Sequence, residues 1–156
     1  MAPPGPRHPD WPKVLTLRRV LEERYRNKTL AHCCGTAAVA LNALLREARP
    51  VVGRFWWRSF TTGCSLDGQI ITPRLYLETQ SRTNCWVMWH GCLLDITATQ
   101  FEPFAMRPVV LLKDPGACLH YMPRVVGAAA EDELLQWLSD DSLNSILREV
   151  RKELKT

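Results

Sequence analysis

Residues 84–98 constrain the fold of this chain more than any other stretch. They run Asn-Cys-Trp-Val-Met-Trp, pass through His90-Gly91 and return as Cys-Leu-Leu-Asp-Ile-Thr-Ala. Two short apolar runs around a glycine-containing pair predict an antiparallel hairpin with a tight turn. Asp95 is the one charged residue of the second run. Because a carboxylate in an apolar strand needs a partner or an open edge, Asp95 is either a functional group or a strand-end carboxylate that caps the backbone.

The rest of the pattern predicts one α+β domain over 10–156, preceded by a proline-rich, disordered tail over 1–9. The expected architecture has N-terminal helices packed on a small antiparallel sheet, followed by C-terminal helices. Apolar spacing, β-branched runs and turn residues define the elements. The expected helices are 12–26, 34–48, 131–138 and one after the caps at 139–141. The expected strands are 51–62, 69–79, 84–89, 92–97 and 109–113. A turn is expected at 63–68 and a connection at 81–83.

Charge and cysteine usage narrow the classes of function. The chain of 156 residues has a formal net charge of +4 and no Lys/Arg block of five, which argues against a nucleic-acid partner. We expect no membrane association, because no apolar run approaches the ~20 residues of a membrane span. The six cysteines come without a secretion signal and without zinc-site spacing, so we expect free thiols in the cytoplasm, no metal and no cofactor.

A second informative motif is Cys33-Cys34-Gly35, which stands at the head of the predicted helix 34–48. Exposed backbone amides and the helix dipole stabilise a thiolate at that position, and the nucleophile's own amide can bind a developing oxyanion. The alternative is that both cysteines are small buried residues, since free cysteine is among the most buried residue types.

Three segments combine into one pattern. Cys34-Gly35-Thr36-Ala37 opens a helix, Asn84-Cys85-Trp86-Val87 forms a strand, and a Gly turn leads to Asp95-Ile96-Thr97-Ala98-Thr99-Gln100-Phe101. This pattern resembles the transglutaminase-like branch of the papain-like cysteine superfamily, in particular its small bacterial and prophage proteins, over residues 12–112. The resemblance implies a Cys-His-Asp site in which Cys34 is the nucleophile, Asp95 orients the base and the histidine position falls on Asn84.

Asn84 departs from that pattern, because asparagine cannot take a proton from a thiol near neutral pH. An asparagine there indicates a degenerate or engineered site. Among the histidines, His32 lies two residues before Cys34 and could replace the base if the loop turns back. His90 is too far along the strand, at about 20 Å from residue 84. His120 has no predicted position, and His8 is in the tail.

These observations leave three functions open. The first is a thiol acyl-transferase or amide hydrolase that acts through a cysteine thioester. The second is a catalytically inactive module that binds a protein or peptide, suggested by Asn84 and by the tryptophan-rich strands. Trp86 and Trp89 are three residues apart on the strand 84–89, so their side chains point to opposite faces of the sheet. One is therefore expected to face the core and the other outward. The third is a dimerising or toxin-related partner that associates through the C-terminal helix. The oligomeric state does not follow from the sequence.

Overall fold

The computed structural model describes residues 2–25, 30 and 33–156. In this part of the chain, four α-helices and a five-stranded antiparallel sheet form an α+β protein, as predicted. The helices are α1 (Trp11–Tyr25), α2 (Cys34–Leu44), α3 (Ala128–Leu135) and α4 (Asp140–Leu154). The strands are β1 (Ala48–Asp67), β2 (Ile70–Trp89), β3 (Cys92–Asp95), β4 (Val110–Leu112) and β5 (Tyr121–Val126), in the order β4-β3-β2-β1-β5.

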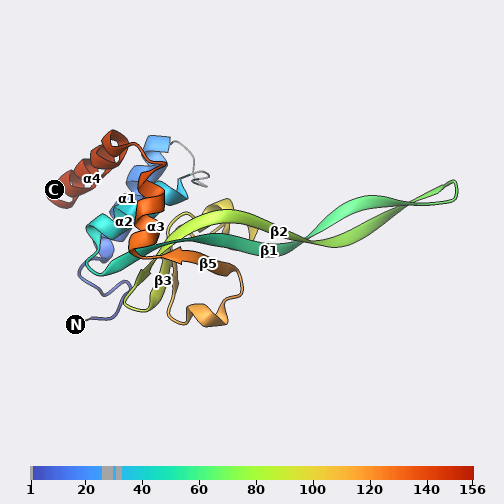
Figure 1. Ribbon diagram of the computed structural model, residues 1–156, viewed down its shortest axis with the longest axis horizontal. Helices are drawn as coiled ribbons and strands as arrows, with labels where there is room; N and C mark the ends of the chain where they lie inside the picture. Colours follow the sequence, from blue (N-terminus) through green and yellow to red (C-terminus); the bar gives the residue numbers. More distant parts are fainter. Residues whose placement is uncertain (1, 26–29, 31–32) are drawn as a thin grey trace.

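A long hairpin of β1 and β2 dominates the shape of the molecule. Each strand has 20 residues, and the two pair without interruption from Ala48↔Trp89 to Asp67↔Ile70. Figure 1 shows the helices at one end, with the distal part of the hairpin extending away from them. The predicted break at 81–83 and the predicted turn at 63–68 are therefore wrong. Polar residues at 81–83 are compatible with an exposed strand, and the turn is confined to 68–69, where Gly68 has a φ of +64°.

The helix predictions are confirmed with shifted ends. α2 stops at Leu44, four residues before the predicted end, because Leu45 is extended and Glu47 has a φ of +65° that turns the chain into β1. α4 begins where the caps predict: the Ser139 hydroxyl accepts a hydrogen bond from the Ser142 N–H. Acidic residues lie in its first turn and basic residues in its last, which complements the helix dipole.

Both faces of the five-stranded part of the sheet are covered. One face packs on α2 and α3, and α1 and α4 complete the same apolar cluster; the sheet side contributes Val52, Cys85, Val87, Trp89, Leu94 and, just after β3, Ile96. The other carries a second apolar cluster, consisting of Val51, Phe55, Trp57, Trp86, Leu93, Phe101 and Tyr121. Trp86 and Trp89 do lie on opposite faces, but both are buried. The expectation that one of them faces outward is wrong, because the segment after β3 covers the second face.

The segment 2–9, expected to be disordered, makes defined contacts instead. His8 is buried, and its Nδ1 accepts a hydrogen bond from the Asp10 N–H at 3.0 Å. Its ring lies edge-on against Trp89, with 4.6 Å between ring centroids. The apolar surface of Trp89 at the end of β2 thus gives the N-terminal segment a place to pack.

Strand β5 has no counterpart among the predicted strands. It pairs with β1 through a register shift between Val52 and Gly53. A Cβ atom on Gly53 would lie 2.2 Å from the Met122 carbonyl oxygen and 2.7 Å from the Trp86 ring. Glycine is therefore required for this close approach, which brings Tyr121 onto the sheet beside β1.

Candidate functional site

The centre of the candidate site is the carboxylate of Asp95 at the end of β3. The Asn84 side-chain amide donates to its Oδ2 at 2.9 Å, and the Tyr121 hydroxyl donates to the same oxygen at 2.9 Å. The backbone N–H and the hydroxyl of Thr97 donate to Oδ1 at 2.8 Å and 3.1 Å. Asn84 and Asp95 are 0% and 1% exposed. The structure thus brings together two of the residues that the sequence singled out and adds Tyr121 to them.

The electrostatics of this network are those of a buried acid surrounded by donors. Burial raises the pKa of Asp95, while the hydrogen bonds from Thr97, Asn84 and Tyr121 act to lower it. Burial and the neighbouring Asp95 raise the pKa of the Tyr121 hydroxyl, which therefore remains a donor. Asn84 Oδ1 is buried and has no hydrogen-bond partner among the described residues. The Asn84 side chain therefore uses its N–H donor on Asp95, while its carbonyl oxygen accepts no hydrogen bond from the described residues.

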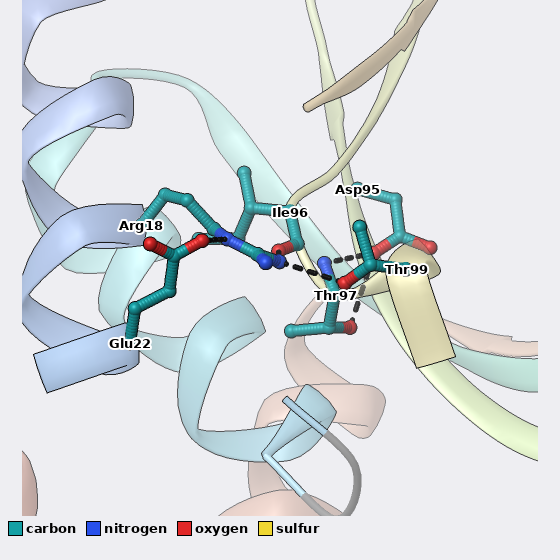
Figure 2. Close-up of polar contacts among 6 residues, drawn as sticks. All are labelled: Arg18, Glu22, Asp95, Ile96, Thr97 and Thr99. Carbon is teal, nitrogen blue, oxygen red and sulfur yellow. Dashed lines mark hydrogen bonds and ion pairs between the residues drawn. The ribbon is translucent and has the colours of Figure 1, made fainter. Parts of the chain in front are cut away.

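A buried arginine holds the segment that follows Asp95. Arg18 reaches from α1 and donates to the Ile96 carbonyl oxygen at 2.6 Å and to the Thr99 hydroxyl at 3.0 Å (Figure 2). It also pairs with Glu22 at 2.7 Å. No local signal in the sequence distinguishes Arg18 from its exposed neighbour Arg19. Arg18 fixes the Asp95 loop from the helix side, while β5 fixes it from the sheet.

Cys34 is the first residue of α2 and is partly exposed. Hydrogen bonding from the thiol and the backbone N–H of Cys85 and from the backbone N–H of Gly35 favours the thiolate of Cys34 and so lowers its pKa. The hydrogen bond from the Cys85 thiol is the largest influence on the Cys34 pKa, which is lowered although burial and the charge of Asp95 oppose the shift. The same contact and burial raise the pKa of Cys85. The structure therefore pairs Cys34 with Cys85, a residue that the sequence analysis named only as part of a strand.

The described histidines are engaged elsewhere. His90 occupies the predicted tight turn with a φ of +49° and lies 3.2 Å from a carboxylate oxygen of Glu47. The Nδ1 atom of His120 lies 2.8 Å from the Trp56 carbonyl oxygen, and its ring stacks on Phe55. His8 packs on Trp89. His32, the candidate substitute base, lies outside the described residues. The described part of the site thus offers Cys34 a thiol neighbour rather than an imidazole.

Two cavities open near these residues. A groove of about 650 Å³ lies on the Tyr121 face of the sheet. Its wall is predominantly apolar and includes Val51, Trp56, Trp86, Met88, Leu93, Pro115, Cys118, Leu119, Tyr121, Met122, Pro123 and Val126. A cavity of about 420 Å³ reaches Cys85 and is lined by Val52, Thr83, Cys85, Arg124, Glu133, Leu134 and Trp137. The first cavity fits an apolar ligand, and the second reaches one member of the thiol pair, Cys85.

Comparison of the chain with protein-family models, curated proteins and solved structures found no match. Among the described residues, no helix combines the length and the apolar character needed to cross a membrane. The site must therefore be interpreted from its own geometry.

The lowered pKa of Cys34 predicts a specific pH dependence of alkylation. A thiolate reacts with iodoacetamide and a thiol does not, so the midpoint of the rate-pH curve should lie below the ordinary thiol value of 9.0. Cys85→Ala should raise this midpoint, because it removes the largest stabilising hydrogen bond and leaves the charge of Asp95 in place. Peptide-level mass spectrometry measures the rate at Cys34 alone. Cys92→Ala, which removes another buried thiol of the sheet, is the control; equal midpoints for all three proteins would contradict the thiol-thiol contact.

Proposed function

We propose that this protein is a binding module that holds an apolar segment of a protein or peptide on a transglutaminase-like scaffold without a catalytic base. The observation that carries the proposal is the Asn84-Asp95 hydrogen bond. In a Cys-His-Asp site the residue at this position passes protons between the sulfur and the substrate. An amide cannot do so, and Asp95 has its lone pairs occupied by four donors.

The groove on the Tyr121 face supports a ligand of apolar character. Its volume of about 650 Å³ lies within the usual range for ligand pockets, about 300–1,000 Å³. Aromatic side chains line it, and aromatic anchors dominate the energetics of peptide recognition. Met122 and Leu119 on its wall are 54% and 73% exposed. Exposed apolar side chains around a concave site are typical of a surface that is covered by a partner.

A second candidate function is acyl transfer through Cys34, and one observation favours it: the pKa of that thiol is lowered. The Cys34 thiolate would attack an amide or ester carbonyl, form a thioester and release the amine or alcohol. The leaving amine needs a proton. The nearest donor is the Cys85 thiol, whose raised pKa makes it a weak acid. We therefore expect acylation by activated esters and little turnover of amides.

Selection of peptides against the groove tests the binding function. A phage-displayed random peptide library should yield apolar sequences that bind the native protein. Met122→Asp places a charge on the groove wall and should weaken binding about 10- to 30-fold, because it desolvates a carboxylate against the ligand. Met106→Asp is the matched control, since Met106 is 91% exposed and lies outside the groove. Failure to enrich any peptide, or equal losses in both variants, would contradict the proposal.

A further inference from the structure

The distal part of the hairpin forms an arm, defined as residues 58–67 of β1 and 70–79 of β2 with the turn between them. Strand β5 pairs with β1 at 51–55, and β3 pairs with β2 at 87–89. In the described chain, therefore, the arm has no third strand on either edge. It extends from the domain as a two-stranded ribbon, clear of the helices (Figure 1).

The two faces of the arm differ in character. Cα partners in an antiparallel pair point their side chains to the same face, so the register assigns each residue to one side of the ribbon. The polar face carries Ser59, Thr61, Gly63, Thr72, Arg74, Tyr76 and Glu78, together with Ile70 beside the turn. The apolar face carries Phe60, Thr62, Cys64, Leu66, Ile71, Pro73, Leu75 and Leu77, and it ends at the domain side with Arg58 and Thr79. Its five large aliphatic and aromatic side chains are each 52–71% exposed.

An amphipathic two-stranded ribbon of this kind is stabilised when another element packs on its apolar face. A two-stranded hairpin alone in water is marginally stable, and a third element packed on its apolar face is what makes it independently stable. The domain does not supply one, because the apolar face is exposed along its length. Pro73 also lacks the N–H that would extend the sheet at the β2 edge. The apolar face of the arm, rather than its β2 edge, is therefore the surface suited to bind a partner.

We propose that the arm is a self-association surface, on which a second copy of this chain packs the apolar face of its own arm. Charge and area both fit this occupant. The arm contains Arg58 and Arg74 against Asp67 and Glu78, so it has no net charge although the chain carries +4. Two arms therefore meet without net repulsion, and the arm lacks the basic excess that favours anionic lipid.

The area of the face suits a pair of arms. At roughly 100 Å² for each large apolar side chain, five of them bring about 500 Å² per arm and about 1,000 Å² for two arms, the lower limit of a specific interface. Because two-stranded ribbons twist strongly, the two arms would coil around each other. This inference does not depend on the proposed peptide-binding function, since the groove and the arm share no residue.

Light scattering after size exclusion, across a micromolar concentration series, tests the proposal with the full chain. The native protein should form dimers. Leu75→Glu, on the apolar face, should weaken dimerisation about 30-fold or more. Thr72→Glu makes the same charge change on the polar face of the same strand and should leave the dimer intact. Circular dichroism checks that both variants retain the fold, which is expected because both positions are exposed and outside the core.

Three results would overturn the proposal. The first is a native protein that stays monomeric at every concentration. The second is a dimer that survives Leu75→Glu, which would place the interface elsewhere. The third is a monomer that binds vesicles of anionic phospholipid and loses this binding in Leu75→Glu, which would assign the apolar face to a membrane surface.

Discussion

Replacing Asp95 with alanine is expected to lower the free energy of unfolding by about 3–5 kcal/mol. The carboxylate is the shared acceptor for the Asn84 amide, the Tyr121 hydroxyl and both donors of Thr97. Each buried donor left without an acceptor costs about 1–3 kcal/mol. Part of the loss is offset because the desolvation cost of the buried acid is removed as well. A loss of this size is a large fraction of the total stability of a domain, about 5–15 kcal/mol.

Urea unfolding followed by tryptophan fluorescence measures this change. Asp132→Ala is the control, because Asp132 is exposed in α3 and its removal should change stability by no more than about 0.5 kcal/mol. Asp95→Asn separates shape from hydrogen bonding, since it keeps the volume but turns one acceptor into a donor that faces other donors. It should also destabilise. If Asp95→Ala lies within about 1 kcal/mol of the native protein, the donors have found other acceptors and the network does not hold the loop.

Replacing Asn84 with histidine is expected to convert a protein that is acylated once at Cys34 into an enzyme that hydrolyses its thioester and releases product repeatedly. The native protein should react with p-nitrophenyl acetate in a burst at Cys34 and then stall, because the described residues offer Cys34 no base that could activate water for deacylation. An imidazole at position 84 could donate to Asp95 through one nitrogen, as the Asn84 amide does. To act as a base, its other nitrogen must reach the Cys34 sulfur, which contacts Cys85 on the opposite face of β2. General-base assistance of this kind contributes about 10²- to 10⁴-fold. Steady-state release of p-nitrophenol measures the gain.

The controls for this experiment separate chemistry from packing. Asn84→Gln enlarges the same buried position without adding a base, so it reports the effect of overpacking, about 1–3 kcal/mol in stability. Cys34→Ala should abolish the burst in every background. An Asn84→His protein no faster than Asn84→Gln would mean that residue 84 does not face the sulfur. If the native protein shows sustained turnover, and Cys34→Ala abolishes it, the result would contradict a binding module without a catalytic base and would favour acyl transfer.

The helices and the tight turn were predictable from the sequence because each depends on residues that lie close together in the chain. The apolar spacing of the first helix, the caps before α4 and the His90-Gly91 turn each act within a few residues, and each prediction was confirmed. The hairpin was divided wrongly at 81–83, because polar residues there indicate a loop by composition. They are tolerated in a strand because the partner strand supplies the hydrogen bonds and leaves their side chains in solvent.

The candidate site was predictable in part. The resemblance placed Asn84 and Asp95 together, and the structure joins them by a hydrogen bond across the β2-β3 side of the sheet. The roles of Arg18, Tyr121 and Cys85 were missed, because each reaches the site through a contact far along the chain: Arg18 is 78 residues from Ile96, and Tyr121 is 26 residues from Asp95. No local motif records such a contact.

The sequence by itself determined the α+β class, the positions of the helices, the tight turn and the pairing of Asn84 with Asp95 beside a helix headed by Cys34. The first three follow from periodicity, capping and turn chemistry, which act over a few residues, and the pairing follows from the resemblance of three segments to a known pattern. Only the tertiary structure decided that the hairpin continues into a free arm, that Arg18 is buried, and that Cys34 meets Cys85. Those outcomes depend on which distant groups supply hydrogen bonds and cover apolar surface, and that is settled when the elements pack.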